Sequence, residues 1–182
     1  MPGKINMKKE KIIGLQNKKV KLFLYNPAWE ELYKKEEKLL RPIVGKYALD
    51  IQHTGSTSIP GAKAKPIIDI IIGVKNLKDG EKFIRPLELL GYEYKHNAGI
   101  KGRHFFAKGS KTEKTHHIHI VKLGGKLWKD QVIFRDYLRK HKEVVAEYNK
   151  LKEGLAKKYE NDREKYTAPK DNFIKSILKR IK

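Results

Sequence analysis

Residues 53–69 contain the side chains of this chain that are best suited to bind an anion. The segment reads HTGSTSIPGAKAKPIID, in which a small-residue turn is followed by a loop with two prolines and then by a carboxylate. In the turn, Gly55, Ser56 and Thr57 allow backbone N–H groups and hydroxyls to face an anion, and Lys63 and Lys65 add positive charge. This combination predicts phosphate binding. The alternative is an ordinary Gly-Ser turn followed by solvated lysines.

The carboxylate at the end of this segment, Asp69, lies in an unusual setting. Residues 67–74 read IIDIIIGV, a pattern typical of a strand that is buried on both faces. An ionised carboxylate in such a strand costs several kcal/mol unless it is paired or bound to a metal. We therefore predict that Asp69 has a partner, and we interpret it as the catalytic, cation-binding residue; the alternative is a strand-end carboxylate with a structural hydrogen bond.

A second stretch with chemical potential is the histidine-rich run at residues 116–121, HHIHIV. In a strand, His117 and His119 share one face, where a metal could bridge them. With Asp69 from a neighbouring strand they would form a two-histidine, one-carboxylate set, which suits zinc, manganese or iron and leaves positions for water or substrate. His53 could be a fourth ligand or a phosphate contact. Alternatively, these histidines line a polar edge and bind nothing.

Several basic residues are further candidates. Arg103, at the junction of a loop and a predicted strand, could bind a phosphate in bidentate fashion or pair with a surface carboxylate. Arg135 and Arg139 flank an aspartate on a predicted helix, which indicates an intrahelical ion-pair network. Spacing alone does not rank Lys152 or Lys170.

Composition narrows the classes of partner. The 182 residues include 42 Lys and Arg against 21 Asp and Glu, a formal net charge of +21, which favours nucleotides, nucleic acid or acidic proteins as partners. Alternatively, many of these lysines only keep the protein soluble. Without cysteine the chain has no disulfide, no Cys-based zinc site and no Cys nucleophile. No apolar run reaches membrane-spanning length and no signal-type segment is present, so we expect no membrane partner and a cytoplasmic location.

The pattern of the chain predicts an α+β fold, because strands cluster early and helices late. We expect a loosely held basic extension over residues 1–18 and a single domain over residues 19–182. The predicted strands span 19–25, 47–53, 67–74, 92–94, 103–108 and 115–122. The predicted helices span 27–44, 77–90 with a kink at Pro86, 128–140, 144–159 and 168–181.

Five ordered motifs together resemble the GrpB-like family, over about residues 20–180. They are the run HTGSTSIPGAKAKPIID, the strand at 117–119, the helix at 134–139, the segment at 147–152 and the tail containing Tyr166, Thr167, Lys170 and Phe173. That family also occurs as a domain fused to dephospho-CoA kinase. It is similar to the nucleotidyltransferase superfamily of the DNA polymerase β type, so the resemblance implies a mixed β-sheet flanked by helices, with a helical C-terminal part.

In that superfamily a Gly-Ser turn positions a triphosphate, an Asp-x-Asp strand follows, and a later strand gives a third carboxylate. Gly55 and Ser56 match the turn and Asp69 matches the first carboxylate, but Ile71 occupies the second position and the histidine strand contains no acid. The resemblance implies a nucleotide or phosphorylated small molecule as ligand, with Mg²⁺, Mn²⁺ or Zn²⁺ as cofactor. The hypotheses are nucleotidyl transfer, a non-catalytic nucleotide- or nucleic-acid-binding module, and metal-dependent hydrolysis.

Overall fold

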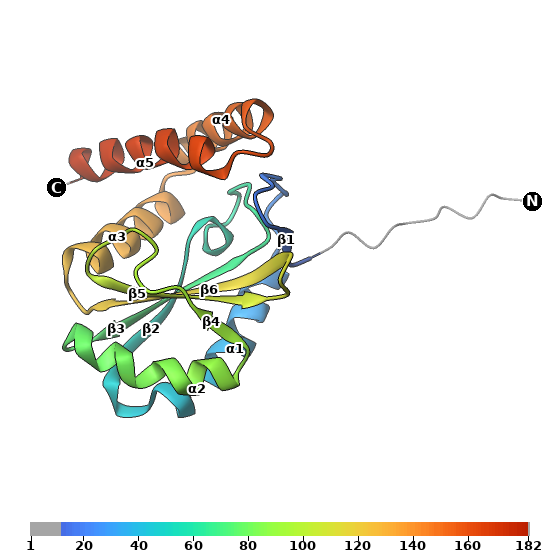
Figure 1. The fold of residues 1–182 in the computed structure, drawn as a ribbon. Helices are drawn as coiled ribbons and strands as arrows, with labels where there is room; N and C mark the ends of the chain where they lie inside the picture. Colours follow the sequence, from blue (N-terminus) through green and yellow to red (C-terminus); the bar gives the residue numbers. More distant parts are fainter. Residues whose placement is uncertain (1–11, 182) are drawn as a thin grey trace, which may run out of the picture.

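A six-stranded mixed sheet runs through the middle of the molecule (Figure 1). The structure is a computed structural model that describes residues 12–181. The strands follow the order β2-β3-β6-β5-β4, and β1 pairs with the start of β6. Their bounds are β1 Leu15–Gln16, β2 Ala48–Thr54, β3 Ile68–Val74, β4 Tyr92–Tyr94, β5 Arg103–Gly109 and β6 Glu113–Lys122. The α+β arrangement with a mixed sheet flanked by helices is confirmed.

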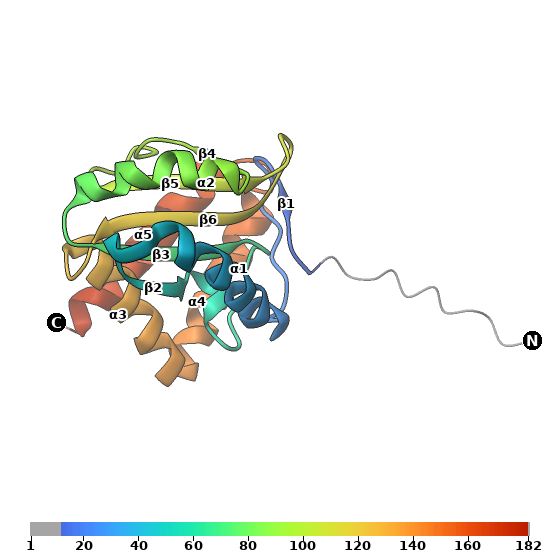
Figure 2. The same ribbon diagram turned by 90° about the horizontal axis from the view of Figure 1, so that it is seen from below.

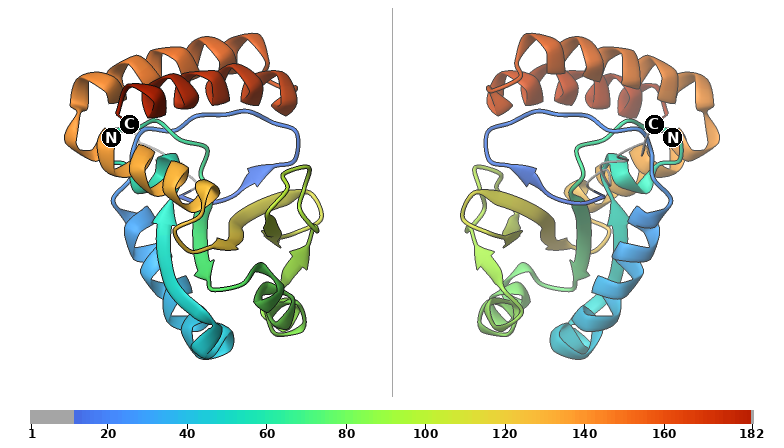
Figure 3. Two further views of the ribbon diagram at one scale, coloured as in Figure 1. Left: turned by 90° about the vertical axis from the view of Figure 1, so that its left-hand side faces the viewer. Right: turned by 90° about the vertical axis from the view of Figure 1, so that its right-hand side faces the viewer.

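Helices cover both faces of the sheet. On one face lie α1 and α2, and on the other lie α3 and then the pair α4 and α5, which forms a separate layer (Figures 2 and 3). Their bounds are α1 Ala28–Val44, α2 Ile84–Leu89, α3 Lys126–Lys140, α4 Lys142–Lys158 and α5 Arg163–Arg180, with short 3-10 turns η1 Gly45–Tyr47, η2 Ser56–Ser58 and η3 Leu77–Phe83. No helix in the range 12–181 has the length and apolar character needed to cross a bilayer.

The register of the central strands determines what faces each helical layer. Strands β3 and β6 are parallel, with Asp69 opposite His117 and Ile71 opposite His119. Because side chains alternate along a strand, these four residues share the face toward α3. The opposite face of β3 is formed by isoleucines that pack under α1 and α2. One face of the sheet therefore supplies the core, and the other presents polar groups.

The hydrophobic clusters explain why space remains on the polar face. The pair α4 and α5 packs on α3 and on the loop after η2, in a cluster that includes Ile59, Ala62, Phe134, Tyr148 and Ile177. A third, small cluster joins the sheet to α3 alone. The last two helices thus rest on α3 and a loop rather than directly on the strands. This arrangement leaves a cavity between them and the sheet.

The N-terminal predictions need correction. The predicted strand at 19–25 is wrong, since that segment forms only an isolated bridge from Phe23 to Ala64. Of the predicted extension, residues 1–11 lie outside the described residues. Residues 12–18 are held rather than loose, because Leu15 is buried in strand pairing with β6 and the Ile12 carbonyl accepts a hydrogen bond from the Trp29 indole at 2.7 Å.

Two predicted helices differ from the observed ones by more than two residues at one end. The helix predicted at 77–90 divides into η3 and α2 at Phe83, before Pro86, which lies in the first turn of α2, where proline is tolerated. The helix predicted from 168 begins five residues earlier, at Arg163. Its N-cap Asp162 accepts a hydrogen bond from the Lys165 backbone N–H at 3.1 Å, and this cap starts the helix ahead of Pro169.

Candidate functional site

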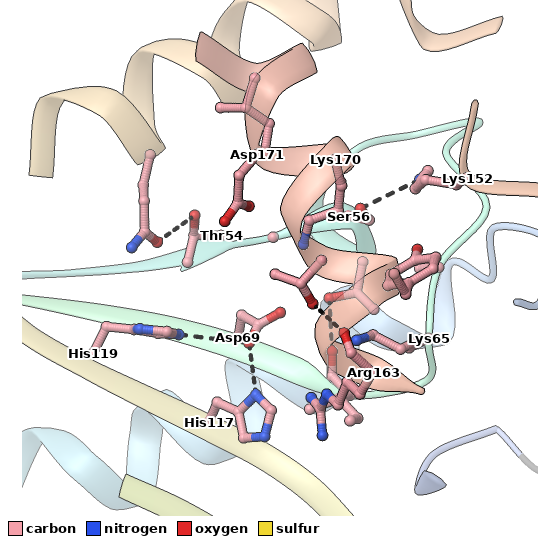
Figure 4. A pocket seen from close by; sticks show the side chains of 18 of the residues that line it. Thr54, Ser56, Lys65, Asp69, His117, His119, Lys152, Arg163, Lys170 and Asp171 are labelled. Carbon is pink, nitrogen blue, oxygen red and sulfur yellow. Dashed lines mark hydrogen bonds and ion pairs between the residues drawn. The ribbon is translucent and has the colours of Figure 1, made fainter. Parts of the chain in front are cut away.

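A cavity of about 980 Å³ lies between the polar face of the sheet and the α4–α5 pair (Figure 4). Its lining comes from parts of the chain that are distant in sequence: the turn after β2, the loop before β3, one face of β3, β5 and β6, and the helices α3, α4 and α5. Most residues predicted to bind phosphate or metal line it, namely Gly55, Ser56, Thr57, Lys65, Asp69, Arg103, His117 and His119, whereas His53 and Lys63 do not. The volume is in the range of pockets that hold nucleotide-sized ligands.

The carboxylate of Asp69 is held by two imidazoles. The Nδ1 atom of His117 donates to Oδ1 of Asp69 at 3.0 Å, and Nε2 of His119 lies 3.6 Å from the same oxygen. Burial opposes ionisation of Asp69, but the contacts with His117 and His119 outweigh it and hold the pKa of the carboxyl well below its ordinary value. The prediction that Asp69 has a partner is confirmed, and the partners are imidazoles.

Arg103 determines how one of these imidazoles is protonated. Its Nη1 lies 3.1 Å from Nδ1 of His119, and a guanidinium has only donors, so Nδ1 accepts. The proton of His119 is thereby assigned to Nε2, the atom that faces Asp69. The other guanidinium nitrogens donate to the carbonyls of Asn97 and Ala98, at 3.0 and 3.3 Å. The fork predicted to bind a phosphate is thus engaged in positioning His119.

Gly55 brings the turn into contact with the carboxylate. A Cβ atom built on Gly55 would lie 2.4 Å from Oδ2 of Asp69. The residue also has φ +68° and ψ −178°, a backbone conformation that residues with a side chain rarely adopt. Only glycine meets both requirements. The turn therefore lies directly against Asp69, as the superfamily resemblance implies for a Gly-Ser turn and its acid.

Lys152 of α4 reaches the same turn. It is 1% exposed, its Nζ donates to the carbonyl of Lys63 and to Oγ of Ser56, the latter at 3.3 Å, and it lies 4.1 Å from the centroid of the Tyr148 ring. Burial and, to a smaller extent, the nearby cation Lys170 lower the pKa of Lys152 to about 7, against a smaller opposing effect of Glu153. Because burial disfavours the charged form of Lys152, an anion bound beside it would stabilise that form.

Lys65, Lys170 and Arg163 add cationic groups beside it (Figure 4). Burial, together with Arg163 and Lys170, holds the pKa of Lys65 well below its ordinary value, and Asp69 opposes this only in part. Burial also lowers the pKa of Lys170, although Asp171 and Asp69 oppose it. The cations thus destabilise one another's charged forms, as expected where several cations surround one ligand site.

Two arginines of α3 fix the turn from behind. Nη1 of Arg135 donates to the carbonyl of His53 at 2.8 Å, and Nε of Arg139 donates to the carbonyl of Ser58 at 2.9 Å. The predicted ion pairs with Asp136 also form, at 2.8 and 4.0 Å. Both arginines therefore position the anion-binding turn as well as forming pairs within their own helix.

Three residues near the site serve the structure instead. His53 projects to the α1 face, with Nδ1 3.1 Å from Glu30 and Nε2 3.0 Å from the Thr57 hydroxyl, so it cannot reach Asp69 as a fourth ligand. The Thr57 hydroxyl also donates to the Ile67 carbonyl at 3.3 Å, so a ligand would have to compete for it. His116 lies on the same face as His53, 3.9 Å from Glu36.

The atoms predicted to bind a divalent metal, on Asp69, His117 and His119, contact one another. Nδ1 of His117 and Nε2 of His119 both face Asp69, and a nitrogen that donates a proton to the carboxylate has no free lone pair for an ion shared with it. Nε2 of His117 keeps its lone pair but lies on the other side of the ring from Asp69. The second carboxylate position is occupied by Ile71, which is fully buried. Over residues 12–181, no group of three or more His, Cys, Asp or Glu is arranged to hold a metal ion. This arrangement does not fit a multidentate metal site, and metal binding stays a prediction.

Sequence reasoning missed part of the site. Arg163 and Asp171 reach the pocket because α5 crosses over it, and Lys152 and Lys170 could not be ranked. The signal that could have selected Lys152 is its spacing of four residues from Tyr148, which places both on one face of the helix. Lysines rarely lie on the inward face of a helix without a partner.

Comparison with known proteins identifies relatives along nearly the whole chain. The family model described as "GrpB protein" matches residues 19–180. The glutamate-rich protein GrpB of Alkalihalophilus pseudofirmus is 42% identical over 171 residues, which cover 92% of this chain and 98% of that protein. The crystal structure of the conserved protein GrpB from Enterococcus faecalis superimposes with a TM-score of 0.80 at 32% identity, covering 88% of this chain and 99% of that one.

Two more distant likenesses extend this finding. A dephospho-CoA kinase of Mycolicibacterium paratuberculosis is 24% identical over 88% of this chain, which corresponds to 46% of that protein. The structure of Cid1 in complex with its short product ApU matches with a TM-score of 0.50 at 12% identity, over 74% of this chain and 42% of Cid1, which shows a nucleotidyltransferase-like fold. With a family match over residues 19–180 and a relative that is 42% identical over 92% of the chain, this chain belongs to the GrpB family.

Proposed function

We propose that this chain binds a nucleotide or another phosphorylated small molecule in the cavity between the sheet and the α4–α5 pair. The observation that carries the proposal is the convergence of four cationic side chains on one pocket beside the Gly55–Ser56 turn. They are Lys65, Lys152, Lys170 and Arg163. Three of them are lysines whose pKa is lowered by burial, so keeping them charged costs free energy. An anionic ligand would offset that cost.

The fold supports the same ligand class. Cid1, which shares the nucleotidyltransferase-like fold, has been determined with its product ApU. In the present chain the Gly-Ser turn lies against Asp69, which is how that fold brings a phosphate-binding turn to an acid. The size of the cavity also suits a nucleoside with its phosphates better than a bare inorganic ion.

Calorimetric titration tests this proposal with a matched pair of variants. The protein is titrated with ATP, UTP and pyrophosphate near physiological ionic strength, where generic attraction to a basic protein is largely screened. Lys65→Gln should weaken binding by about tenfold or more, since it removes a charge-assisted hydrogen bond. Lys63→Gln should leave it unchanged, because Lys63 pairs with Glu153 outside the cavity. Equal affinity in the two variants, or no uptake by wild type, would contradict the proposal.

Nucleotidyl transfer is a second candidate, favoured by the match of Asp69 to the superfamily's first carboxylate at the wall of the pocket. Release of pyrophosphate from labelled UTP or ATP, lost in Asp69→Asn, would support transfer. Binding that persists without release would favour the non-catalytic module. RNA serves as a competing ligand in the same titrations: RNA that binds at physiological salt equally to wild type and Lys65→Gln would locate nucleic-acid binding outside this cavity.

A further inference from the structure

The cavity has more positive than negative charge in its walls. Its lining includes seven Lys and Arg side chains and five Asp and Glu side chains, an excess of two positive charges when all are ionised. Two acids of the lining, Asp69 and Asp171, act electrostatically on Lys170 (Figure 4). Asp69 already interacts with two imidazoles. The charge to be balanced by a ligand is therefore that of a phosphoryl group, which has close to two negative charges at neutral pH.

The groups that hold a metal in nucleotidyl transfer are occupied or replaced here. Oδ1 of Asp69 interacts with both imidazoles, and Arg103 occupies Nδ1 of His119. The position of the second acid is the fully buried Ile71. A divalent ion bound to Oδ1 of Asp69 would have to displace these contacts, and a divalent ion on either oxygen would add positive charge to a pocket that already has an excess.

We propose that the lysine cluster takes the place of a bridging metal, so that Lys65, Lys152, Lys170 and Arg163 bind the terminal phosphate of a nucleotide directly, as the metal-free anion. This inference rests on the proposed function, because it concerns the same pocket. It adds that the ligand is recognised as a free phosphate dianion, and that Asp69 opposes binding of the ligand through its charge instead of supporting it through a metal.

The surroundings of each lysine agree with this assignment. Lys65 faces Arg163 and Lys170 from α5, Lys152 from α4 and Asp69 from β3, and it lies 5.1 Å from the Tyr166 ring. Lys152 faces Lys170 from α5, Glu153 from its own helix and Ser56 from the turn. Lys170 faces Arg163 and Asp171 from its own helix and Asp69 from the sheet. Since the pKa values of these lysines are lowered, a bound dianion should raise them, and binding should take up protons from the buffer.

The experiment is calorimetric titration of the full chain with UTP and ATP, first with EDTA and then with excess Mg²⁺ or Mn²⁺. We expect binding in EDTA, with an affinity equal to or greater than that with metal, and net proton uptake when buffers of different ionisation enthalpy are compared. Asp69→Asn, which keeps the shape of the side chain, should tighten binding by on the order of threefold to tenfold, since it removes a negative charge close to the phosphate.

The outcomes separate this inference from the proposed function. Binding that requires Mg²⁺ or Mn²⁺ and is lost in Asp69→Asn would overturn the inference and leave nucleotide binding intact. No binding under either condition would overturn both. Thermal unfolding of Asp69→Asn, followed by circular dichroism, verifies that the variant is folded. If it is not, the comparison of EDTA with metal in wild type decides the question alone.

Discussion

The lowered pKa of Lys152 predicts that the unliganded protein becomes more stable as the pH rises from 7 to 9. The pKa is about 7 in the folded state and 10.5 in the unfolded reference. Between these values the unfolded chain binds a proton that the folded chain does not, so the free energy of unfolding increases with pH. The destabilisation is greatest at and below pH 7, and it is relieved as the pH rises toward the unfolded pKa.

The magnitude follows from the same two values. A group of this kind contributes about 1.4 kcal/mol per pH unit where the two protonation states differ fully, which gives about 2 kcal/mol for Lys152 between pH 7 and pH 9. Lys65 and Lys170 are shifted in the same direction and add to the trend. The pKa of the buried tyrosines Tyr33, Tyr92, Tyr148 and Tyr166 is raised, so these side chains stay protonated in both states below pH 9 and do not contribute.

Urea unfolding at several pH values in this range provides the assay, without nucleotide or phosphate buffer. Lys152→Met should be more stable than wild type at pH 7 and should show a flatter dependence on pH, because it removes the titrating group and retains the buried stem. It should also bind nucleotide more weakly. Stability that stays constant or falls from pH 7 to pH 9, or an equal slope in Lys152→Met, would refute the reasoning.

Two further predictions concern the turn. Gly55→Ala should lower the free energy of unfolding by more than the ~1–3 kcal/mol expected for a strained backbone alone, because the added Cβ meets Asp69. The control in thermal melts is Gly61→Ala, since Gly61 has φ +81° but no close neighbour. Equal losses in the two variants would contradict the contact with Asp69. Arg135→Met should cost about 1.5–3 kcal/mol through the unpaired His53 carbonyl, as measured by urea unfolding. Arg139→Met should cost less because its side chain is 36% exposed, and the reverse order would show that the carbonyl contact of Arg135 is not the stabilising one.

The parts of the site that were predictable from sequence are those set by local pattern. The run of isoleucines identifies β3, and the alternation of residues 117–121 identifies β6 and the face that His117 and His119 share. An acid inside such a strand requires a partner on physical grounds, and the imidazoles meet that requirement. These inferences depend only on strand periodicity and on the cost of burying a charge.

The remaining parts depend on contacts distant in sequence. The alternation at 19–25 indicates a strand, but only Phe23 forms a β-bridge, to Ala64, since β1 and not this segment pairs with the sheet. The donors of Arg103 are taken by carbonyls of a loop whose path no local pattern reveals. Lys152, Arg163 and Lys170 meet because α4 and α5 pack on α3, and the sequence does not show how a helix pair lies across a sheet.

The measurement that tests the central claim most directly is a crystal structure of the chain with a nucleoside triphosphate bound, obtained in the presence of EDTA. We expect phosphate density in the cavity among Lys65, Lys152, Lys170 and Arg163, beside the Gly55–Ser56 turn. A nucleotide bound at another surface, or a phosphate reached only through a metal on Asp69, would contradict the account.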